Sequence, residues 1–276
     1  MLTDYHVHLR PDDDPEWPAA RAFTAENFER YRQTAAERGV EELGVAEHIH
    51  RFQQALTIWQ HPFWRQYAHD DLDYYCGFVR EETDLRLGIE MDFIPGAEDR
   101  IANVLDGRDW DYVVGSVHFL RDHSLDTEDY SIWGAGESAD RIWRRYFETV
   151  AHSALSGLYD IIGHPDLVKV WGSATPVPDR DPRFFYEPAV EAFAEAGVAV
   201  ELSTAGLRKP VGEQYPARPY LEMILEAGCP IALSSDAHLP EQLGFRYEQA
   251  LELLDELGVK ELAVFERRQR RMEAIG

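Results

Sequence analysis

The sequence predicts a single α/β domain in which seven or eight strands form a closed or nearly closed barrel. Three observations support this fold class. Short apolar runs alternate with helix-like runs along the chain, which is the pattern of βα units and a parallel sheet. A chain of 276 residues with 45% hydrophobic content is an ordinary size for one such barrel. Metal-ligand types of side chain follow the apolar runs, and barrels carry their functional residues at strand ends.

The first half of the chain is divided by clear helix and turn signals. The opening strand carries His6 and His8, and an acidic loop over 10–15 follows, in which two prolines forbid regular structure. A helix is expected from Thr24, as its N-cap, to Arg38, before a glycine. The other elements expected here are a strand over 43–47, a helix over 71–82, and strands over 85–89 and 111–117.

The stretch over 51–66 is rich in aromatic residues but has no clean helical or strand period. An insertion after a barrel strand is where such folds build substrate pockets. We therefore consider Trp59 and Trp64 as candidate substrate-binding residues. The alternative is that these rings pack over the end of the barrel.

The second half continues the alternation of strands and helices. Apolar positions from 138 to 156 fit one face of a helix, and Gly157 ends it. Three prolines make 176–182 a loop. The other elements expected here are strands over 160–163, 198–202, 231–235 and 262–265, and helices over 187–195, 220–226 and 240–257.

Composition excludes several classes of protein. A formal net charge of −24 disfavours a nucleic-acid partner, and the basic cluster at 267–271 is interpreted as a solvated terminus. The chain has no apolar run of about 18 residues and its opening is too polar for a signal peptide, so no membrane partner and a cytoplasmic location are expected. Cys76 and Cys229 are far apart and are expected to be packed thiols.

The candidate ligands of a metal centre recur at the strand ends. Two histidines two residues apart on a strand share one face. The candidates are His6, His8, His48, Glu90, His118, His164, Asp236 and His238. Imidazoles together with a carboxylate suit zinc, iron or manganese, and this set is too large for one tetrahedral ion. The sequence therefore predicts more than one metal ion.

Three of these ligands have a competitor two residues further along the same face. His50 competes with His48, Asp92 with Glu90, and Asp166 with His164. Motifs of other catalytic machineries are absent from the sequence. It has no Gly-x-Ser-x-Gly, no phosphate-binding Gly-x-x-x-x-Gly-Lys loop and no Gly-x-Gly-x-x-Gly.

Several short motifs together resemble a known series. They are His6-Val7-His8, Glu47-His48, Ile89-Glu90, Gly115-Ser116-Val117-His118, Gly163-His164-Pro165-Asp166 and Ser235-Asp236-Ala237-His238. Over nearly the whole chain they resemble the PHP (polymerase and histidinol phosphatase) superfamily. The run over 203–210, followed by Gln214-Tyr215-Pro216, resembles its stand-alone histidinol-phosphatase branch.

The resemblance implies one domain over 1–276, a distorted, TIM-like (β/α)7 barrel that holds two to three divalent zinc, iron or manganese ions. His6, His8, Glu90 and Asp236 would hold one ion, Glu90 would bridge to a second held by His118 and His164, and His48 with His238 would hold a third. The family often has a histidine six residues after the second histidine of its opening motif. Here that position is Asp14, and the aspartate run over 12–14 leaves the register of this ligand open.

The resemblance also implies the hydrolysis of L-histidinol phosphate to L-histidinol and phosphate in histidine biosynthesis. Two close metals would activate a water as hydroxide and clamp the phosphoryl oxygens. Glu90, Asp236 and His238 are the expected catalytic residues, and His238 is one candidate proton donor. Arg208 and Lys169 are the cations expected on the phosphate.

Three alternatives remain open. The chain could act on a nucleotide or another small phosphate ester as a related PHP enzyme. It could also be an amidohydrolase-type barrel, although no well-placed bridging lysine is found. Finally, it could be a metal-binding or partner-binding module without catalytic activity. The sequence leaves the oligomeric state undetermined.

Overall fold

The computed structural model describes residues 1–11 and 19–276, and its main sheet has seven parallel strands in the order β1-β2-β3-β4-β7-β8-β9. Their bounds are β1 (Thr3–Asp4), β2 (Glu42–His48), β3 (Arg86–Asp92), β4 (Val114–Ser116), β7 (Ile161–Ile162), β8 (Ala199–Ser203) and β9 (Ile231–Ser234). Beyond β1 and β9, Val7 forms a parallel bridge with Ala237. There the amide of His8 donates to the carbonyl of Ala237 at 2.7 Å. The sheet is therefore a nearly closed barrel, and the predicted fold class is confirmed.

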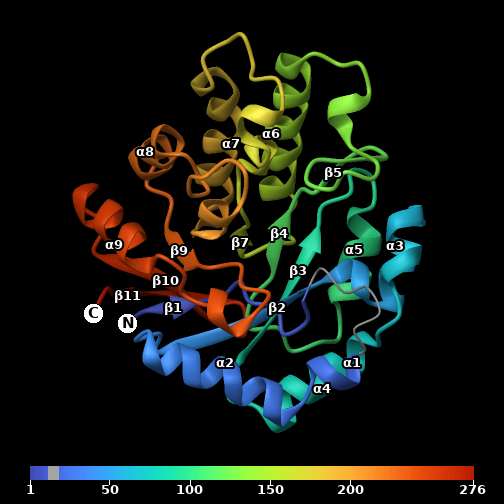
Figure 1. Ribbon diagram of the computed structural model, residues 1–276, viewed down its shortest axis with the longest axis vertical. Helices are drawn as coiled ribbons and strands as arrows, with labels where there is room; N and C mark the ends of the chain where they lie inside the picture. The colour runs from blue at the N-terminus through green and yellow to red at the C-terminus, as the bar shows by residue number, and fades with distance from the viewer. Residues whose placement is uncertain (12–18) are drawn as a thin grey trace.

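Helices surround the strands on the outside of the barrel (Figure 1). They are α1 (Ala19–Ala22), α2 (Ala25–Glu37), α3 (Pro62–Tyr67), α4 (Leu72–Glu82), α5 (Glu98–Leu105), α6 (Ala139–Leu155), α7 (Arg183–Ala196), α8 (Arg218–Glu226) and α9 (Tyr247–Glu256). Within the described ranges, none of these is long and apolar enough to cross a membrane.

Local capping explains where two of the predicted helices begin. The hydroxyl of Thr24 accepts from the amide of Asn27 at 3.1 Å, and α2 ends before Gly39, whose φ is +72°. The carboxylate of Asp71 accepts from the amide of Asp73 at 2.8 Å and caps α4. Both helices are confirmed with nearly their predicted bounds.

One expectation about a helix is wrong. The helix expected over 240–257 is instead a 3-10 turn, η7 (Pro240–Gln242), followed by α9. Gly244 and Arg246 take positive φ values of 61° and 55°, and this left-handed backbone separates the two pieces. The short helix α5 was not predicted. Most of the acidic loop expected over 10–15 lies outside the described residues.

The inside of the barrel changes character from one end to the other. Near the N-terminal ends of the strands, Tyr112 fills the interior over Gly44 and Gly88, where a Cβ would lie 2.4 and 2.3 Å from its side-chain atoms. Further along the same two strands, His48 and Glu90 lie at or near the C-terminal ends. Apolar packing therefore occupies one end of the barrel and ionisable groups the other.

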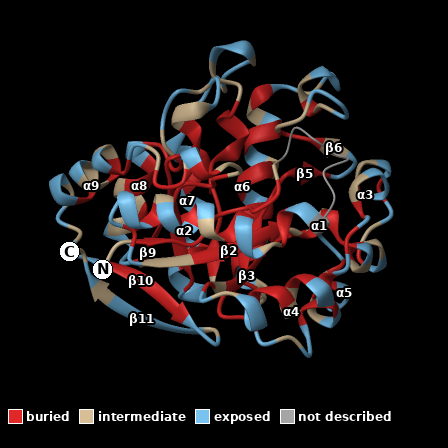
Figure 2. Cartoon of the chain, turned by 60° about the horizontal axis from the view of Figure 1, so that its bottom comes forward, coloured by how far each residue is buried: buried red, intermediate tan, exposed pale blue. Residues whose placement is uncertain are grey.

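A C-terminal hairpin covers the apolar end of the barrel. It consists of β10 (Glu261–Glu266) and β11 (Gln269–Ala274), and β10 is largely buried while β11 is largely exposed (Figure 2). Phe265 packs edge-on to Tyr5, with ring centroids 5.9 Å apart. The strand expected over 262–265 is thus present, but it pairs with β11 and does not join the barrel.

The basic cluster at 267–271 contributes to this attachment. Arg268 donates to the carboxylate of Asp160 at 2.8 Å and to the carbonyl of Leu158 at 2.7 Å. Its interpretation as a solvated terminus is wrong for Arg268, because the guanidinium connects the hairpin to the barrel.

The segment over 121–137 contains little regular structure. Its elements are β6 (His123–Ser124), which pairs with β5 (Phe119–Leu120), and the 3-10 turn η3 (Ile132–Gly134).

Candidate metal centre and active site

The predicted ligands converge at the C-terminal ends of the barrel strands. Because all seven strands run parallel, side chains that follow them meet at one end of the barrel. Those brought together are His6, His8, His48, Glu90, His118, His164, Asp236 and His238. Asp14 lies outside the described residues.

Glu90 is the centre of this cluster and is 1% exposed. The imidazoles that face it are those of His6, His8, His48, His118 and His164. Its Oε1 lies 3.0 Å from Nε2 of His164 and 3.3 Å from Nε2 of His118. Its Oε2 lies 3.4 Å from Nε2 of His6 and contacts Nδ1 of His48. The two oxygens thus face different groups of imidazoles, as a bridging carboxylate requires.

Asp236 and His238 complete the cluster on the side of His8. Oδ1 of Asp236 lies 3.3 Å from Nε2 of His8 and 3.6 Å from Nδ1 of His238. The imidazoles of His48 and His238 approach to 3.2 Å at their Nε2 atoms, and both stack on His8.

Bound metal ions explain the arrangement of these side chains better than hydrogen bonds between them do. Several buried atoms of the cluster have no hydrogen-bond partner among the described residues, including Nε2 of His6, Nε2 of His8 and Oδ1 of Asp236. Buried polar atoms in proteins are normally paired, so these atoms need another partner. Three groups have ligand atoms within 4.8 Å of one another: His8 with His48 and His238, His6 with His8 and Glu90, and His48 with Glu90 and His118. Imidazole nitrogens with carboxylate oxygens suit zinc, iron or manganese, and the three groups fit two to three ions.

A second set of carboxylates holds the ligand imidazoles from behind. Oε1 of Glu201 lies 2.7 Å from Nδ1 of His6, and Oδ1 of Asp92 lies 2.7 Å from Nδ1 of His118. Such contacts fix which ring nitrogen is available to a metal. The sequence analysis did not identify Glu201, although a carboxylate inside the apolar strand β8 was a usable signal.

Charged neighbours within the cluster shift the pKa values of its residues in the direction opposite to the effect of burial. Burial alone would lower the pKa of His6, but nearby carboxylates, with Glu201 foremost, hold this pKa well above its ordinary value. Burial likewise opposes protonation of His118, yet Asp92 and Glu90 raise its pKa well above 6.5. For Glu90, burial would raise the pKa, and the surrounding imidazoles hold it well below the ordinary value. Without metal, His6 and His118 therefore retain protons that a metal must displace.

The competing residues have other partners. His50 stacks on His48, with ring centroids 4.8 Å apart, and Asp92 supports His118. Asp166 forms an ion pair with Lys169 and accepts from the amide of Ala217 at 2.8 Å. Among the residues that the structure describes, His48, Glu90 and His164 are therefore the members of each pair that point into the cluster.

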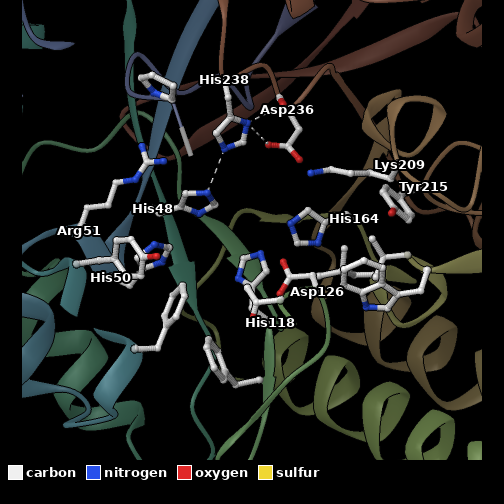
Figure 3. Close-up of a pocket in the computed structure, with 18 of the residues that line it drawn as sticks. His48, His50, Arg51, His118, Asp126, His164, Lys209, Tyr215, Asp236 and His238 are labelled. Atoms are coloured by element: carbon white, nitrogen blue, oxygen red, sulfur yellow. Dashed lines mark hydrogen bonds and ion pairs between the residues drawn. The ribbon is translucent and has the colours of Figure 1, made fainter. Parts of the chain in front are cut away.

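A cavity of about 350 Å³ opens over the cluster (Figure 3). His48, His118, His164, Asp236 and His238 line it together with further groups. The apolar and aromatic part of its wall is formed by His50, Phe63, Tyr67, Phe119, Leu167, Val170, Trp171 and Tyr215. The cavity therefore offers a polar floor and aromatic walls to a small ligand.

The predicted aromatic residues lie elsewhere. Trp64 is 0% exposed and Trp59 packs edge-on to it, with centroids 5.4 Å apart, and neither is among the described residues that line the cavity. Phe63 and Tyr67 of the same helix line it instead. Residues four apart share a helix face, so α3 turns these two rings outward to the cavity and Trp64 inward. The packing alternative thus describes Trp64.

The two cations predicted to contact the phosphate, Lys169 and Arg208, bind other groups of the protein. Lys169 is 8% exposed, forms an ion pair with Asp166 at 2.9 Å and donates to the carbonyl of Gln214. Nη2 of Arg208 donates to the carbonyls of Ser235 at 2.9 Å and Asp236 at 2.8 Å. Neither side chain is among the described residues that line the cavity.

Lys209, which follows Arg208 in sequence, is the cation that lines the cavity at this point, and its side chain reaches into it (Figure 3). Within the described chain, no carboxylate lies within ion-pair distance of its ammonium group. The sequence analysis quoted Lys209 only as part of a motif.

A nearly closed barrel with this ligand set defines a metal-binding α/β barrel protein. The PHP domain model matches residues 23–205, and the chain belongs to this family. The match contains His48, Glu90, His118 and His164, and the opening and closing motifs lie outside it. The family assignment made from the motifs is confirmed.

Two curated relatives share substantial sequence with the chain. The probable histidinol-phosphatase of Deinococcus radiodurans is 35% identical over 234 residues, which cover 83% of this chain and 86% of that protein. The histidinol-phosphatase of Bacillus subtilis is 30% identical over 192 residues, which cover 63% of this chain and 70% of that protein.

A solved structure supports the fold. The histidinol phosphate phosphatase of Lactococcus lactis, crystallised with zinc, L-histidinol and phosphate, has a TM-score of 0.72 and 19% identity and covers 98% of each chain. At this identity the likeness establishes the barrel architecture.

Proposed function

We propose that the protein hydrolyses L-histidinol phosphate to L-histidinol and phosphate in histidine biosynthesis. The observation that carries the proposal is Glu90, whose two oxygens face separate groups of imidazoles beneath a cavity lined with aromatic rings. The names of the relatives in Deinococcus radiodurans and Bacillus subtilis support the substrate. A biosynthetic role of this kind also supports a cytoplasmic location.

The chain's own residues would bind the ions and the phosphate. His6, His8 and Asp236 would hold one ion, and the other ligands the remaining one or two, with Glu90 between them. When bound, these ions would act as Lewis acids on water and on the phosphoryl oxygens. Lys209 would neutralise phosphate charge from the cavity wall.

Two further groups have roles in the proposal. His238 lines the cavity, and it would return a proton to the leaving alkoxide if two ions bind and it is not itself a ligand. Nη1 of Arg208 is buried without a hydrogen-bond partner among the described residues, so this guanidinium is a candidate for a further phosphate contact. The contacts of Lys169 give it no comparable role.

The test is phosphate release from L-histidinol phosphate, a nucleoside monophosphate and a phosphodiester, measured with metal-analysed protein with and without chelator. We expect histidinol phosphate to have the highest kcat/KM and chelator to abolish turnover. A wide preference for a generic monoester would contradict the substrate. Tight metal binding without turnover on any ester would instead indicate a non-catalytic module.

A further inference from the structure

Asp126 is a carboxylate of the cavity wall that the metal cluster does not use. Among the described lining residues, the only other carboxylate is Asp236, which belongs to the cluster. Oδ1 of Asp126 accepts from the hydroxyl of Ser124 at 2.9 Å. Within the described part of the chain, no Lys, Arg or His forms an ion pair with it. Its negative charge is therefore available to a ligand in the cavity.

The backbone around Asp126 is held in place by its neighbours. The amide of Leu125 donates to the carbonyl of His118 at 2.9 Å, and the indole nitrogen of Trp171 donates to the carbonyl of Leu125 at 2.7 Å. The hydroxyl of Ser124, which is 0% exposed, also accepts from the amide of Asp126 at 3.3 Å. The carboxylate is thus fixed before a ligand arrives, which reduces the entropic cost of using it.

The negative charge of Asp126 would repel a phosphate bound in the cavity. The cations Arg10, Arg51 and Lys209 line the same cavity and suit an anionic group. Asp126 lines this cavity together with the ligands His118 and His164, so its charge faces the cluster. A carboxylate so close to the phosphate position weakens phosphate binding unless the ligand also carries a positive charge.

The covalent structure of histidinol phosphate meets this requirement. Its ammonium group is attached to the carbon next to the ester methylene, so it stays close to the phosphate when the phosphate binds at the metals. Asp126 lies beside His118 at the edge of the cluster (Figure 3). The rings of Trp171 and Tyr215 form the adjoining wall.

We propose that Asp126 binds the ammonium group of the substrate and selects phosphate monoesters that carry an amine next to the ester carbon. The inference rests on the proposed function and specifies how its substrate is recognised. Asp126 is then a specificity-determining residue, and the metals bind and act without it.

The experiment compares two substrates, L-histidinol phosphate and the same ester without its amine, 3-(imidazol-4-yl)propyl phosphate. We expect wild-type protein to have a kcat/KM about 10- to 100-fold higher for L-histidinol phosphate than for the ester without the amine. This range corresponds to one charge-assisted hydrogen bond. Asp126→Asn should remove this preference by lowering kcat/KM for histidinol phosphate alone, with metal content unchanged. Asp129→Asn is the matched control, because Asp129 is exposed on the same segment and does not line the cavity.

The outcomes separate this inference from the function on which it rests. If wild-type protein hydrolyses both esters equally well, or if Asp126→Asn reduces both equally, Asp126 does not recognise the amine. The wild-type comparison decides this even if the variant does not fold. If wild-type protein hydrolyses neither ester, the proposed function fails, and the selection of an amine-bearing phosphate fails with it.

Discussion

Replacing Arg208 distinguishes two roles for its guanidinium, support of the ligand loop and contact with phosphate. Nη2 donates to the carbonyls of Ser235 and Asp236, and the backbone of Asp236 has a φ of +50°. A hydrogen bond from a charged donor contributes about 1.5–3 kcal/mol, and Arg208 is only partly buried, so water replaces part of the loss. We therefore expect Arg208→Ala to lower the free energy of unfolding by about 3 kcal/mol.

The assay is urea unfolding of chelator-treated protein, followed by elemental analysis after reloading with metal. Arg246→Ala is the control, because Arg246 also lies over the ring of Phe245 but is exposed. We expect Arg208→Ala alone to lose stability and bound metal. Normal stability and full metal content, with a 10- to 150-fold loss of kcat/KM, would refute the loop role and indicate a phosphate contact.

Two further predictions concern the barrel interior and the protons of the cluster. Gly88→Ala should lower the free energy of unfolding by about 1–3 kcal/mol through overpacking, because its Cβ would lie 2.3 Å from Tyr112. Gly77→Ala is the control and should not destabilise the protein, because a Cβ there would have no atom within 4 Å. Equal unfolding midpoints for the two variants would disprove this. Because the pKa values of His6 and His118 are raised, metal binding at pH 7 should release protons, and metal affinity should rise with pH up to those pKa values. Calorimetric titration in two buffers of different ionisation enthalpy measures this, and identical heats would contradict it.

The sequence was sufficient for the barrel because its strands are short apolar runs between strong helix and turn signals. Thr24 marked the start of one helix through its capping side chain, which acts locally. The hairpin of β10 and β11 could not be placed in the same way. Its position depends on Phe265 packing near Tyr5, a contact between the two ends of the chain.

The predicted ligands depended on strand ends, which a parallel barrel brings together whatever the details of its loops. The residues around the substrate cavity depend instead on local turns. Lys209 lines the cavity and Arg208 contacts Ser235, because the chain leaves the 3-10 turn η6 (Ala205–Arg208) between them. Single-residue shifts of this kind cannot be read from composition or periodicity.

The most direct measurement is anomalous X-ray scattering from crystals of metal-loaded wild-type protein and Glu90→Gln, with elemental analysis of both. The geometry predicts ions on both sides of Glu90, one near His6 and His8 and another near His118, and more than two equivalents of metal per chain in active wild-type protein. Glu90→Gln should lose metal on both sides together with its activity. Active protein with a single ion, or with anomalous density on only one side of Glu90, would contradict the bridged cluster.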